Sequence, residues 1–372
     1  MADQNDSSQN IVLTLVESNT AVGLTTEQSA AAIRAGMSGF REHPLYAPIA
    51  WEFDPGEDSA KVASHGLIDG FDDGRLYALL IDPLTTLVEE SGLSRSAMAN
   101  GGLYLALPAN DEVIQKLNLR RHFLKLLSER LALPTTREFL AVQTGSTGVY
   151  QLIERAMEKM RAGEMEFCIV AAVDSYLLHD RLGFYDQNWR LKSDRNPTGF
   201  IPGEAASAFL LETEKHARQR KAPVLLRIDG VGGGQEPNPI TGDKTSTGAG
   251  LTDAIRSLSE RANIGQPWRW VLSDLNGERY KAYEWGVALP RLNKLIAADH
   301  EFAHYADTIG DVGAAMAGVQ LGCVSEAFSR NYAPAGSALL FAGNDAGNRY
   351  AMSVSKVQQG DQDMLTSSKG EN

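Results

Sequence analysis

The chain has 372 residues, of which 43% are hydrophobic, and this is enough to bury a large core. Its 35 lysine and arginine residues stand against 47 aspartate and glutamate residues, giving a net charge of −12, which disfavours nonspecific binding to nucleic acid or anionic lipid. No stretch approaches the roughly 20 consecutive apolar residues of a membrane span, and two cysteines without an evident pairing suit a reducing compartment. We therefore expect a cytoplasmic protein with neither nucleic acid nor membrane as a partner.

The chain is predicted to have two similar halves in which strands and helices alternate. The polar stretch 1–10 is expected to be a disordered tail. The first half, 11–215, ends in the strand AFLLE and a charged connector, TEKHARQRKAP, and the second half, 222–354, starts with the strand VLLRIDG. Residues 357–372 are poor in hydrophobic side chains and are expected to form a second disordered tail. Alternating strands and helices predict parallel sheets in an α/β fold.

A turn into a core helix is predicted within the first half, where Thr144 to Val149 reads TGSTGV. Apolar residues then recur at the helical period and predict one buried stripe, made of Val149, Leu152, Ile153, Ala156, Met157 and Met160. After Gly163 the run EMEFCIVAAVDS is apolar, β-branched and too short for a helix, so it predicts a buried strand. The segment RNPTGFIPGEAASAFLLE adds a Pro-Gly turn and another buried strand.

The second half contains the stretch VGGGQEPNPITGDKTSTGAG, 231–250, which is predicted to be a loop ahead of the helix LTDAIRSLSERAN. Thr252 and Asp253, in the first turn of that helix, are candidates for its N-cap. A glycine-rich loop before a helix can bind phosphate. This loop lacks the G-x-x-x-x-G-K-[ST] spacing, so we do not expect a phosphate site.

Taken in order, these segments resemble the β-ketoacyl synthases, the condensing enzymes of the thiolase superfamily. That family has A-C-x-[ST]-G-[VL] opening a long helix, then an I-A-G-G-x-[DE]-S strand, then G-E-G-A-x-[AL]-x-[VL]-L-E. Further similar segments are NIVLTLVESNTAVGLTTEQSAAAIRAGMSGF, IGDVGAAMAGVQLG and GSALLFAGNDAGNRYAMSV, so the resemblance extends from about Ile11 to Val354. It implies a thiolase-like α/β fold of two similar βαβαβαββ halves in five layers, α-β-α-β-α.

The resemblance also shows where the family's reactive groups should be. In the family a cysteine thiolate takes the acyl group, and two histidines polarise the thioester and stabilise the enolate. Matching the cysteine motif to TGSTGV puts Gly145 where the thiol belongs, and the two histidine positions correspond to Asp274 and Asp311. Two carboxylates at neutral pH would oppose an enolate. The resemblance therefore implies vacated catalytic positions and neither a cofactor nor a metal.

Other residues could supply a nucleophile. Ser146 is a weak candidate, because a serine needs an adjacent base and neither Asp274 nor Asp311 would have a near-neutral pKa without deep burial. The alternative is that Ser146 only caps the helix that follows it. Cys168 and Cys323 lie on apolar runs, so we expect both to be small buried hydrophobic residues.

The string HEFAH, from His300 to His304, matches the H-E-x-x-H motif of zinc hydrolases, with Glu301 as the general base. Such a site needs a long helix and a third ligand. Here the string lies just before the glycine turn that ends in Asp311, and no third ligand is evident. We therefore expect a solvent-facing polar turn that binds no metal.

Three functions remain open. The main hypothesis is a catalytically inactive protein that uses the fold as a scaffold or adaptor for binding other proteins. The chain is similar to short ketosynthase-like proteins with IPGEAA and DLNGE segments that occur beside type VI secretion components in bacteria, which implies a secretion adaptor or effector complex as partner. The alternatives are a divergent β-ketoacyl-carrier-protein synthase or acyltransferase, and a chain-length-factor-like subunit of fatty acid or polyketide synthesis.

The resemblance further implies assembly with a second subunit. In the thiolase fold a strand of one subunit pairs with its mate across a two-fold axis. The apolar run that follows the core helix is predicted to be this dimer edge, because an exposed apolar strand needs covering; it consists of Phe167, Cys168, Ile169, Val170, Ala171, Ala172 and Val173. We expect a homodimer or a pair with a like-folded subunit.

Overall fold

The computed structural model describes residues 10–43, 61–72, 74–130, 137–193, 196–262 and 264–357. Its main sheet has the strand order β10-β9-β11-β12-β8-β1-β7-β6-β4-β5, and the two halves of the chain meet where β1 pairs with β8. The first half supplies β1 (Ile11–Thr20), β4 (Gly102–Ala106), β5 (Glu138–Val142), β6 (Phe167–Ser175) and β7 (Glu204–Thr213). The second half supplies β8 (Leu226–Gln235), β9 (Trp268–Ser273), β10 (Ile296–His304), β11 (Ser337–Gly343) and β12 (Asn348–Ser355).

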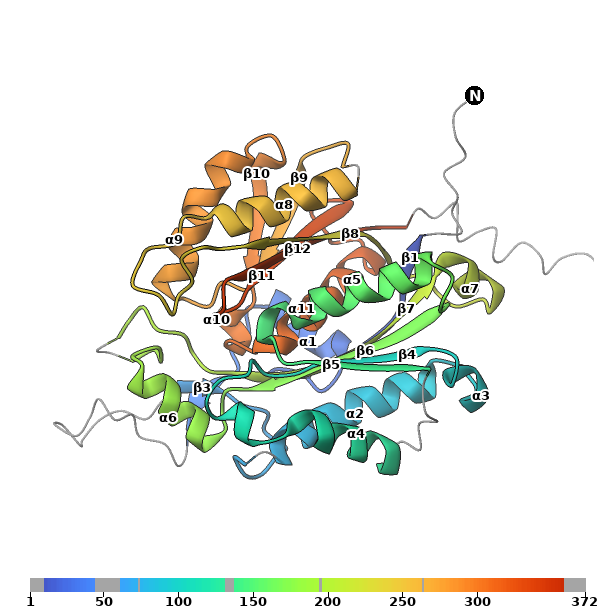
Figure 1. The fold of residues 1–372 in the computed structure, drawn as a ribbon, viewed down its shortest axis with the longest axis horizontal. Helices are drawn as coiled ribbons and strands as arrows, with labels where there is room; N and C mark the ends of the chain where they lie inside the picture. Colours follow the sequence, from blue (N-terminus) through green and yellow to red (C-terminus); the bar gives the residue numbers. More distant parts are fainter. Residues whose placement is uncertain are drawn as a thin grey trace, which may run out of the picture.

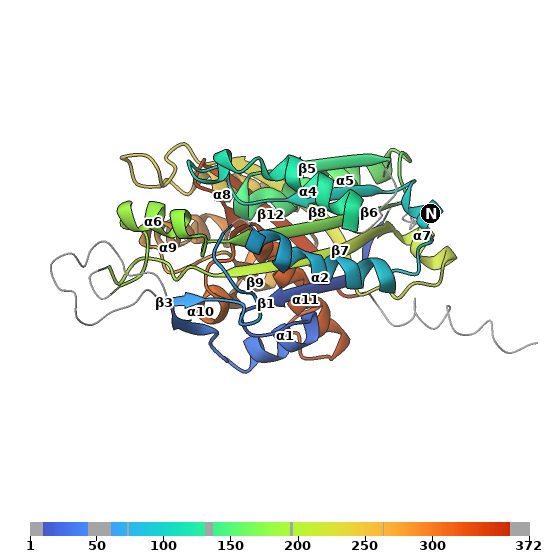
Figure 2. The ribbon, with the colours of Figure 1, turned by 90° about the horizontal axis from the view of Figure 1, so that it is seen from below.

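The helices and strands are stacked in five layers, α-β-α-β-α (Figure 1). The first-half strands are covered on their outer face by α2 (Gly74–Glu90) and α4 (Leu119–Arg130). Figure 2 shows α2 lying over β1 and β7, against which it packs. The outer layer of the second half is α8 (Ala249–Arg261) and α9 (Arg279–Ala288), and the central layer holds α1 (Thr26–Arg34), α5 (Gly148–Arg161) and α11 (Met316–Ser329).

Short elements connect these layers. A separate two-stranded sheet is made of β2 (Phe40–Glu42) and β3 (Lys61–Ala63). The short α-helices are α3 (Arg95–Met98), α6 (His179–Gln187), α7 (Glu214–Gln219) and α10 (Ala306–Ile309). The 3-10 helices are η3 (Ile114–Lys116), η4 (Gly145–Thr147), η5 (Leu289–Leu292) and η6 (Gly313–Ala315).

The two halves repeat one topology. Counting the main-sheet strands of each half in chain order, the first half has the spatial order third, second, fourth, fifth, first (β5-β4-β6-β7-β1), and the second half has the same order (β10-β9-β11-β12-β8). The third strand leads through η4 into the central helix α5 in the first half, and through α10 and η6 into the central helix α11 in the second. The predicted pair of similar βαβαβαββ halves in five layers is therefore confirmed.

The hydrophobic core follows the layers. The largest cluster lies between the first-half strands and the second-half strands of the main sheet. It includes residues of α5 and α11 and the strand residues that face them. A second cluster joins α2 and α4 to the outer face of the first-half strands, and a third joins α8 and α9 to the second-half strands. Among the central helices, α11 is buried around almost its whole surface, whereas α5 buries one apolar stripe and leaves Arg155 and Glu158 exposed.

The predicted core helix is confirmed as α5. All the residues of its predicted stripe are buried, which are Val149, Leu152, Ile153, Ala156, Met157 and Met160. The helix is followed by Gly163, whose φ of +70° reverses the chain toward β6. The N-terminal end of the helix directly follows the turn formed by η4.

The prediction that the apolar run Phe167, Cys168, Ile169, Val170, Ala171, Ala172 and Val173 forms the sheet edge is wrong. That run is β6, which is hydrogen-bonded to β7 on one side and to β4 on the other. Its alternate residues belong to different core clusters, Cys168 and Val170 to the central one and Ile169 and Ala171 to the outer one. The continuous apolar sequence thus reflects a strand covered on both faces by helices. The edge strands are β5 and β10.

The predicted disordered tails lie outside the described residues except at their inner ends. Asn10 donates from its side-chain amide to Glu214 at 2.8 Å, and Val357 packs against a small cluster around Val12 and Ala217. Within the described residues, no helix combines the length and the apolar character needed to cross a membrane.

Candidate functional site

Two glycine turns meet at the N-terminal ends of the central helices. Gly145, in η4, has a φ of +58°, and Gly313, in η6, has a φ of +48°; both values lie in the left-handed region that favours glycine. The two turns pack against each other. Asp311 lies at the second turn, where its Oδ1 accepts from the amide of Gly313 at 2.9 Å. Two of the sequence-predicted positions, Gly145 and Asp311, therefore come together.

The turn at Gly145 is tightly packed and bonded to the second half. A Cβ at Gly145 would lie 3.1 Å from the Cβ of Ala109. The hydroxyl of Ser146 donates to the carbonyl of Gly343 at 2.9 Å, at the end of β11. The expectation that Ser146 caps the helix is wrong, because its bond goes to a carbonyl and not to a helix amide. Thr147 is the N-cap residue and makes no side-chain capping bond.

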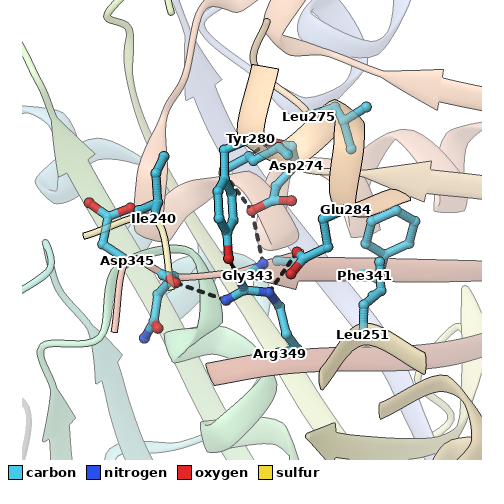
Figure 3. Close-up of a pocket in the computed structure, with 13 residues that line it drawn as sticks. Ile240, Leu251, Asp274, Leu275, Tyr280, Glu284, Phe341, Gly343, Asp345 and Arg349 are labelled. Carbon is cyan, nitrogen blue, oxygen red and sulfur yellow. Dashed lines mark hydrogen bonds and ion pairs between the residues drawn. The ribbon is translucent and has the colours of Figure 1, made fainter. Parts of the chain in front are cut away.

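Asp274 follows β9, and its side chain lies near Gly343 in the pocket drawn in Figure 3. Its Oδ2 accepts from the amide of Gly343 at 3.0 Å and pairs with Nζ of Lys281 at 2.8 Å. Burial by itself would lower the pKa of Lys281, but the carboxylates of Asp274, Asp311 and Glu278 raise it above its usual value. Lys281 is therefore a charged ammonium group that neutralises the carboxylate at a predicted vacant position.

Asp274 lines a pocket that the protein fills with its own side chains. Figure 3 shows Glu284 and Arg349 pointing toward each other across this pocket, and their ion pair is 2.7 Å long. Arg349 also donates to the hydroxyl of Tyr280 at 3.1 Å. The remaining cavity is about 10 Å³, which accommodates about one water molecule. An acyl chain does not fit in this space.

Asp311, at the other histidine position, belongs to a chain of polar contacts. The side-chain amide of Asn276 donates to Asp311 at 2.6 Å and to Glu278 at 3.0 Å. Glu278 pairs with Arg190 at 2.7 Å, and the same guanidinium pairs with Asp345 at 2.5 Å. The carboxylate at position 311 is thus connected to an arginine through one amide and one further carboxylate.

A third group of charged residues supports the turns and was not predicted from the sequence. Arg181 is completely buried and pairs with Asp174 at 2.5 Å and with Asp111 at 2.9 Å. The other oxygen of Asp174 accepts from the amide of Ala314 at 2.9 Å. Burial raises the pKa of Asp174, and Arg181 and the Ala314 amide oppose that rise. A Cβ at Gly313 would lie 2.1 Å from Asp174 Oδ2, so only glycine fits there without a shift. The sequence feature that could have indicated this charged group is Asp174, the aspartate in the apolar run AAVDS.

The two cysteines are buried, free thiols. Burial raises the pKa of both, that of Cys323 to about 12. Cys168 packs with Met160 and Met165 in the central core, near the C-terminal end of α5. Neither thiol lines the closed pocket beside Asp274. The prediction that both cysteines are small buried residues is confirmed.

The HEFAH string is part of strand β10, so the expectation of a polar turn is wrong. A strand rises about 3.3 Å per residue, which places the Cα atoms of His300 and His304 roughly 13 Å apart. His300 bonds to the carbonyl of Ala297 at 2.7 Å, and His304 lies 3.8 Å from Asp307. A zinc site of the helical type is excluded by this geometry. Across the described ranges, no group of His, Cys, Asp and Glu side chains has the arrangement of a metal site.

The glycine-rich stretch before α8 is occupied by an internal carboxylate. Its first residues belong to β8, and α8 has Gly248 as its N-cap residue, so the expected cap by Thr252 or Asp253 is wrong. The hydroxyl of Thr252 donates to the carbonyl of Gly248 at 2.6 Å. The amides at the helix start instead bond to Glu236, from Thr247 at 2.8 Å and Gly250 at 3.1 Å. A phosphate would have to displace this carboxylate.

The chemistry available at the turns follows from this geometry. Among the described residues that line the closed pocket there is no cysteine and no histidine. The charged groups present are guanidinium, ammonium and carboxylate groups joined in ion pairs, and none of these supplies a nucleophile or a base near neutral pH. An enolate formed here would face the carboxylates of Asp274 and Asp311, which oppose a developing negative charge.

Comparison with known proteins gives structural matches only. No protein-family model and no curated protein matches the chain. One similar structure is the ishigamide ketosynthase/chain length factor, with a TM-score of 0.74 and 15% identity over 94% of this chain and 99% of that chain. Another is a chain of a type II polyketide synthase acyl-carrier protein in complex with its ketosynthase, with a TM-score of 0.78, 14% identity, and 94% and 99% coverage.

A third similar structure is a β-ketoacyl synthase from Burkholderia phymatum, with a TM-score of 0.72 and 14% identity over 94% of this chain and 100% of that chain. At identities this low, the likeness establishes the fold and not the activity. The repeated topology and the match over nearly the full length of these chains agree. The chain has the thiolase-like α/β fold of the ketosynthases.

Proposed function

We propose that this protein is a non-catalytic ketosynthase-fold subunit that acts by binding a like-folded protein, as a chain-length-factor-like subunit would. The observation that carries the proposal is the state of the three positions matched to the catalytic set. Gly145 has no side chain, Asp274 is paired with Lys281, and Asp311 is bonded to Asn276. These groups form a closed set of contacts that leaves no acid, base or nucleophile exposed to a substrate.

The remaining nucleophiles support the same proposal. The proton of the Ser146 hydroxyl is directed to the carbonyl of Gly343, and both cysteine thiols are buried with raised pKa values. A divergent synthase or acyltransferase would need at least one such group to be accessible and activated by a neighbouring base. The pocket at Asp274 is also too small for an acyl chain. Catalysis by this chain alone is therefore disfavoured.

The open edge of β5 is the surface that supports a like-folded partner. Among the described strands, β5 pairs with β4 alone, and its apolar residues Phe139, Leu140, Ala141 and Val142 are half-buried. An exposed apolar edge strand readily pairs with a strand of another chain. One of the similar structures is named a ketosynthase/chain length factor, which agrees with a pairing of two such subunits. The partner interface is accordingly proposed at β5 in place of β6.

A secretion adaptor or effector complex as partner stays a prediction from the resemblance. No contact, cavity or charge pattern described above favours that partner over a like-folded subunit. Purification of the protein with its bound partner distinguishes a secretion partner from a like-folded subunit, because the bound chain can be identified directly.

The pairing is tested by a proline substitution that blocks one hydrogen-bond donor. The carbonyl of Val142 accepts from Leu107, on the β4 side, so the amide of the preceding residue, Ala141, points to the open side. Ala141→Pro removes that donor, and Ala141→Ser keeps it as a matched control. An edge strand tolerates a proline whose missing N–H faces outward, so both variants should remain folded.

We expect light scattering after gel filtration to show a dimer for the unmodified chain, alone or with a co-expressed ketosynthase, and for Ala141→Ser. Ala141→Pro should be monomeric with an unchanged circular dichroism spectrum. A chain that is monomeric under all conditions and retains no ketosynthase-fold subunit would contradict the proposal. Retention of a secretion adaptor in place of such a subunit would also contradict it and would support the secretion hypothesis.

A further inference from the structure

An open groove of about 830 Å³ is lined in part by Gln143 and Thr144, which directly precede the Gly145 turn. Its wall on the first half comes from the segment after β4, from the residues after β5 and from α6. Its second-half lining consists of Ile240, Thr241, Asn344, Asp345, Ala346 and Asn348. Asn344 and Asp345 line both the groove and the closed pocket. This volume lies within the range of ligand-binding sites in proteins.

The charges of the groove disfavour an anionic ligand. Its lining contains the carboxylates of Asp111, Glu112 and Asp345 and one cation, Arg190. Arg190 is already paired with Glu278 and Asp345. Asp111 is paired with Arg181, whereas Glu112 is exposed and has no ion pair or hydrogen bond among the described residues. A phosphate, including that of phosphopantetheine, would find no free cation in the described lining.

The groove offers hydrogen-bonding groups that match a peptide backbone. Asn110, Gln115 and Gln143 line it, and none of their side-chain amides takes part in a hydrogen bond within the described part of the chain. A carboxamide both donates and accepts, so a row of them can satisfy the alternating N–H and C=O groups of an extended chain. An acyl chain offers no such groups and would leave these amides unsatisfied. The lining therefore favours a polar, extended ligand.

An exposed tryptophan, Trp189, stands in the sequence between Asn188 and Arg190, two residues that line the groove. Trp189 is 63% exposed and has a φ of +54°. The side-chain amide of Asn196 donates to its carbonyl at 2.7 Å, which supports this strained backbone. A large aromatic side chain held in solvent is typical of a binding anchor, and its ring face attracts a lysine or arginine side chain.

We propose that this groove binds an extended, basic peptide segment of a partner protein in place of an acyl-phosphopantetheine. The proposal rests on the proposed binding function and specifies the chemistry of what is bound. Glu112 attracts the positive charge of the peptide, Trp189 packs against one of its basic side chains, and the amides of Asn110, Gln115 and Gln143 bond to its backbone.

The test uses a short fluorescein-labelled peptide of alternating lysine and serine, titrated with the full chain and followed by fluorescence anisotropy. We expect saturable binding that weakens by about tenfold in Glu112→Lys and by about fivefold in Trp189→Ala, since both side chains contact the ligand directly. The matched control is Glu260→Lys on α8, an exposed residue in the outer layer of the other half. It makes the same charge change away from the groove and should leave the affinity nearly unchanged.

Two further probes separate the ligand classes. A peptide of alternating glutamate and serine and free 4′-phosphopantetheine should neither bind nor displace the lysine peptide. If Glu112→Lys and Glu260→Lys weaken peptide binding equally, the peptide is attracted nonspecifically to an acidic protein, and the proposal that it binds in the groove is wrong. Displacement by phosphopantetheine would overturn the peptide as ligand. Ala141→Pro should not change peptide binding. The proposal of peptide binding in the groove can therefore be refuted while the proposal of pairing through β5 is supported, and the reverse is also possible.

Discussion

Ser146 and Asp274 bond to opposite sides of the same residue, Gly343. The Ser146 hydroxyl donates to the Gly343 carbonyl at 2.9 Å, while Asp274 Oδ2 accepts from the Gly343 amide at 3.0 Å. The hydroxyl proton is thus directed away from the carboxylate, and the two cannot act as nucleophile and base in this arrangement. Both side chains instead fix the end of β11 against the two halves of the protein.

The packing at Gly145 predicts a stability difference between two glycine substitutions. Gly163→Ala imposes a left-handed φ with no atom within 4 Å of the new Cβ, so it should cost about 1 kcal/mol. Gly145→Ala has a similar φ and also a contact with Ala109 at 3.1 Å, and should cost about 1 kcal/mol more. Urea unfolding of both variants measures the difference, and equal costs would show that the Ala109 contact is relaxed.

The pair Asp274–Lys281 is predicted to be strongly coupled. Lys281→Met leaves a carboxylate that is 7% exposed without its cation, and should lower the free energy of unfolding by about 3 kcal/mol. Asp274→Asn in the same chain removes that charge, while its amide oxygen can still accept from Gly343. The double variant should therefore be more stable than Lys281→Met alone. A double-mutant cycle by chemical unfolding checks this, and additive costs would exclude the coupling.

Glu17 predicts a pH dependence of stability. Burial, together with Glu27, Glu90 and Glu326, raises the pKa of Glu17 to about 7 from its ordinary 4.5. The folded state therefore binds this proton more tightly than the unfolded state does. The resulting stabilisation is present in full below pH 4.5 and is lost as the pH rises to about 7.

Glu17→Gln should remove this contribution, so the variant should gain on the wild type by about 1 kcal/mol between pH 5 and 8, a value reduced for partial exposure. Urea unfolding of both chains at several pH values tests the sign as well as the size. A variant whose stability follows the wild-type curve at every pH would show that Glu17 ionises normally in the folded protein.

The cysteines are predicted to be unreactive in the folded protein. Because burial raises the pKa of both Cys168 and Cys323, neither thiol should be alkylated by iodoacetamide at pH 8 in native buffer, and both should react in urea. Intact-mass spectrometry counts the adducts. Rapid modification of one cysteine in the native protein would reveal an accessible thiolate and would support the hypothesis of a divergent synthase or acyltransferase.

The five layers were implied by the resemblance to the ketosynthases, and the residue pattern predicted the core helix α5 and the alternation of strands and helices. The stripe of α5 from Val149 to Met160 has a clear period, and the two halves alternate strands and helices in the same order. The role of β6 could not be predicted in this way, because an interior strand covered by helices and an edge strand covered by a partner have the same apolar composition. Only the pairing of β6 with both β4 and β7 distinguishes them.

The contacts of the site were also beyond the sequence. Ser146 and Gly343 are 197 residues apart, and Arg181 joins Asp111 to Asp174 from a separate helix. No spacing along the chain indicates such meetings, since they depend on how two halves with the same topology face each other. Gly145 and Asp311, which the resemblance assigned to the catalytic set, lie at adjoining turns. Lys281 and Arg349, which fill the pocket beside Asp274, had no counterpart in the motifs.

We propose that this protein has the fold of a condensing enzyme without its chemistry. Incubation of the full chain with malonyl- and acyl-carrier protein, followed by intact-mass spectrometry and a carbon dioxide assay, tests this proposal. We predict that the mass of the chain stays unchanged and that no carbon dioxide is released above the level without protein. An acyl adduct on Ser146 or on either cysteine, or malonyl decarboxylation that depends on Asp274, would show that the protein is a catalyst.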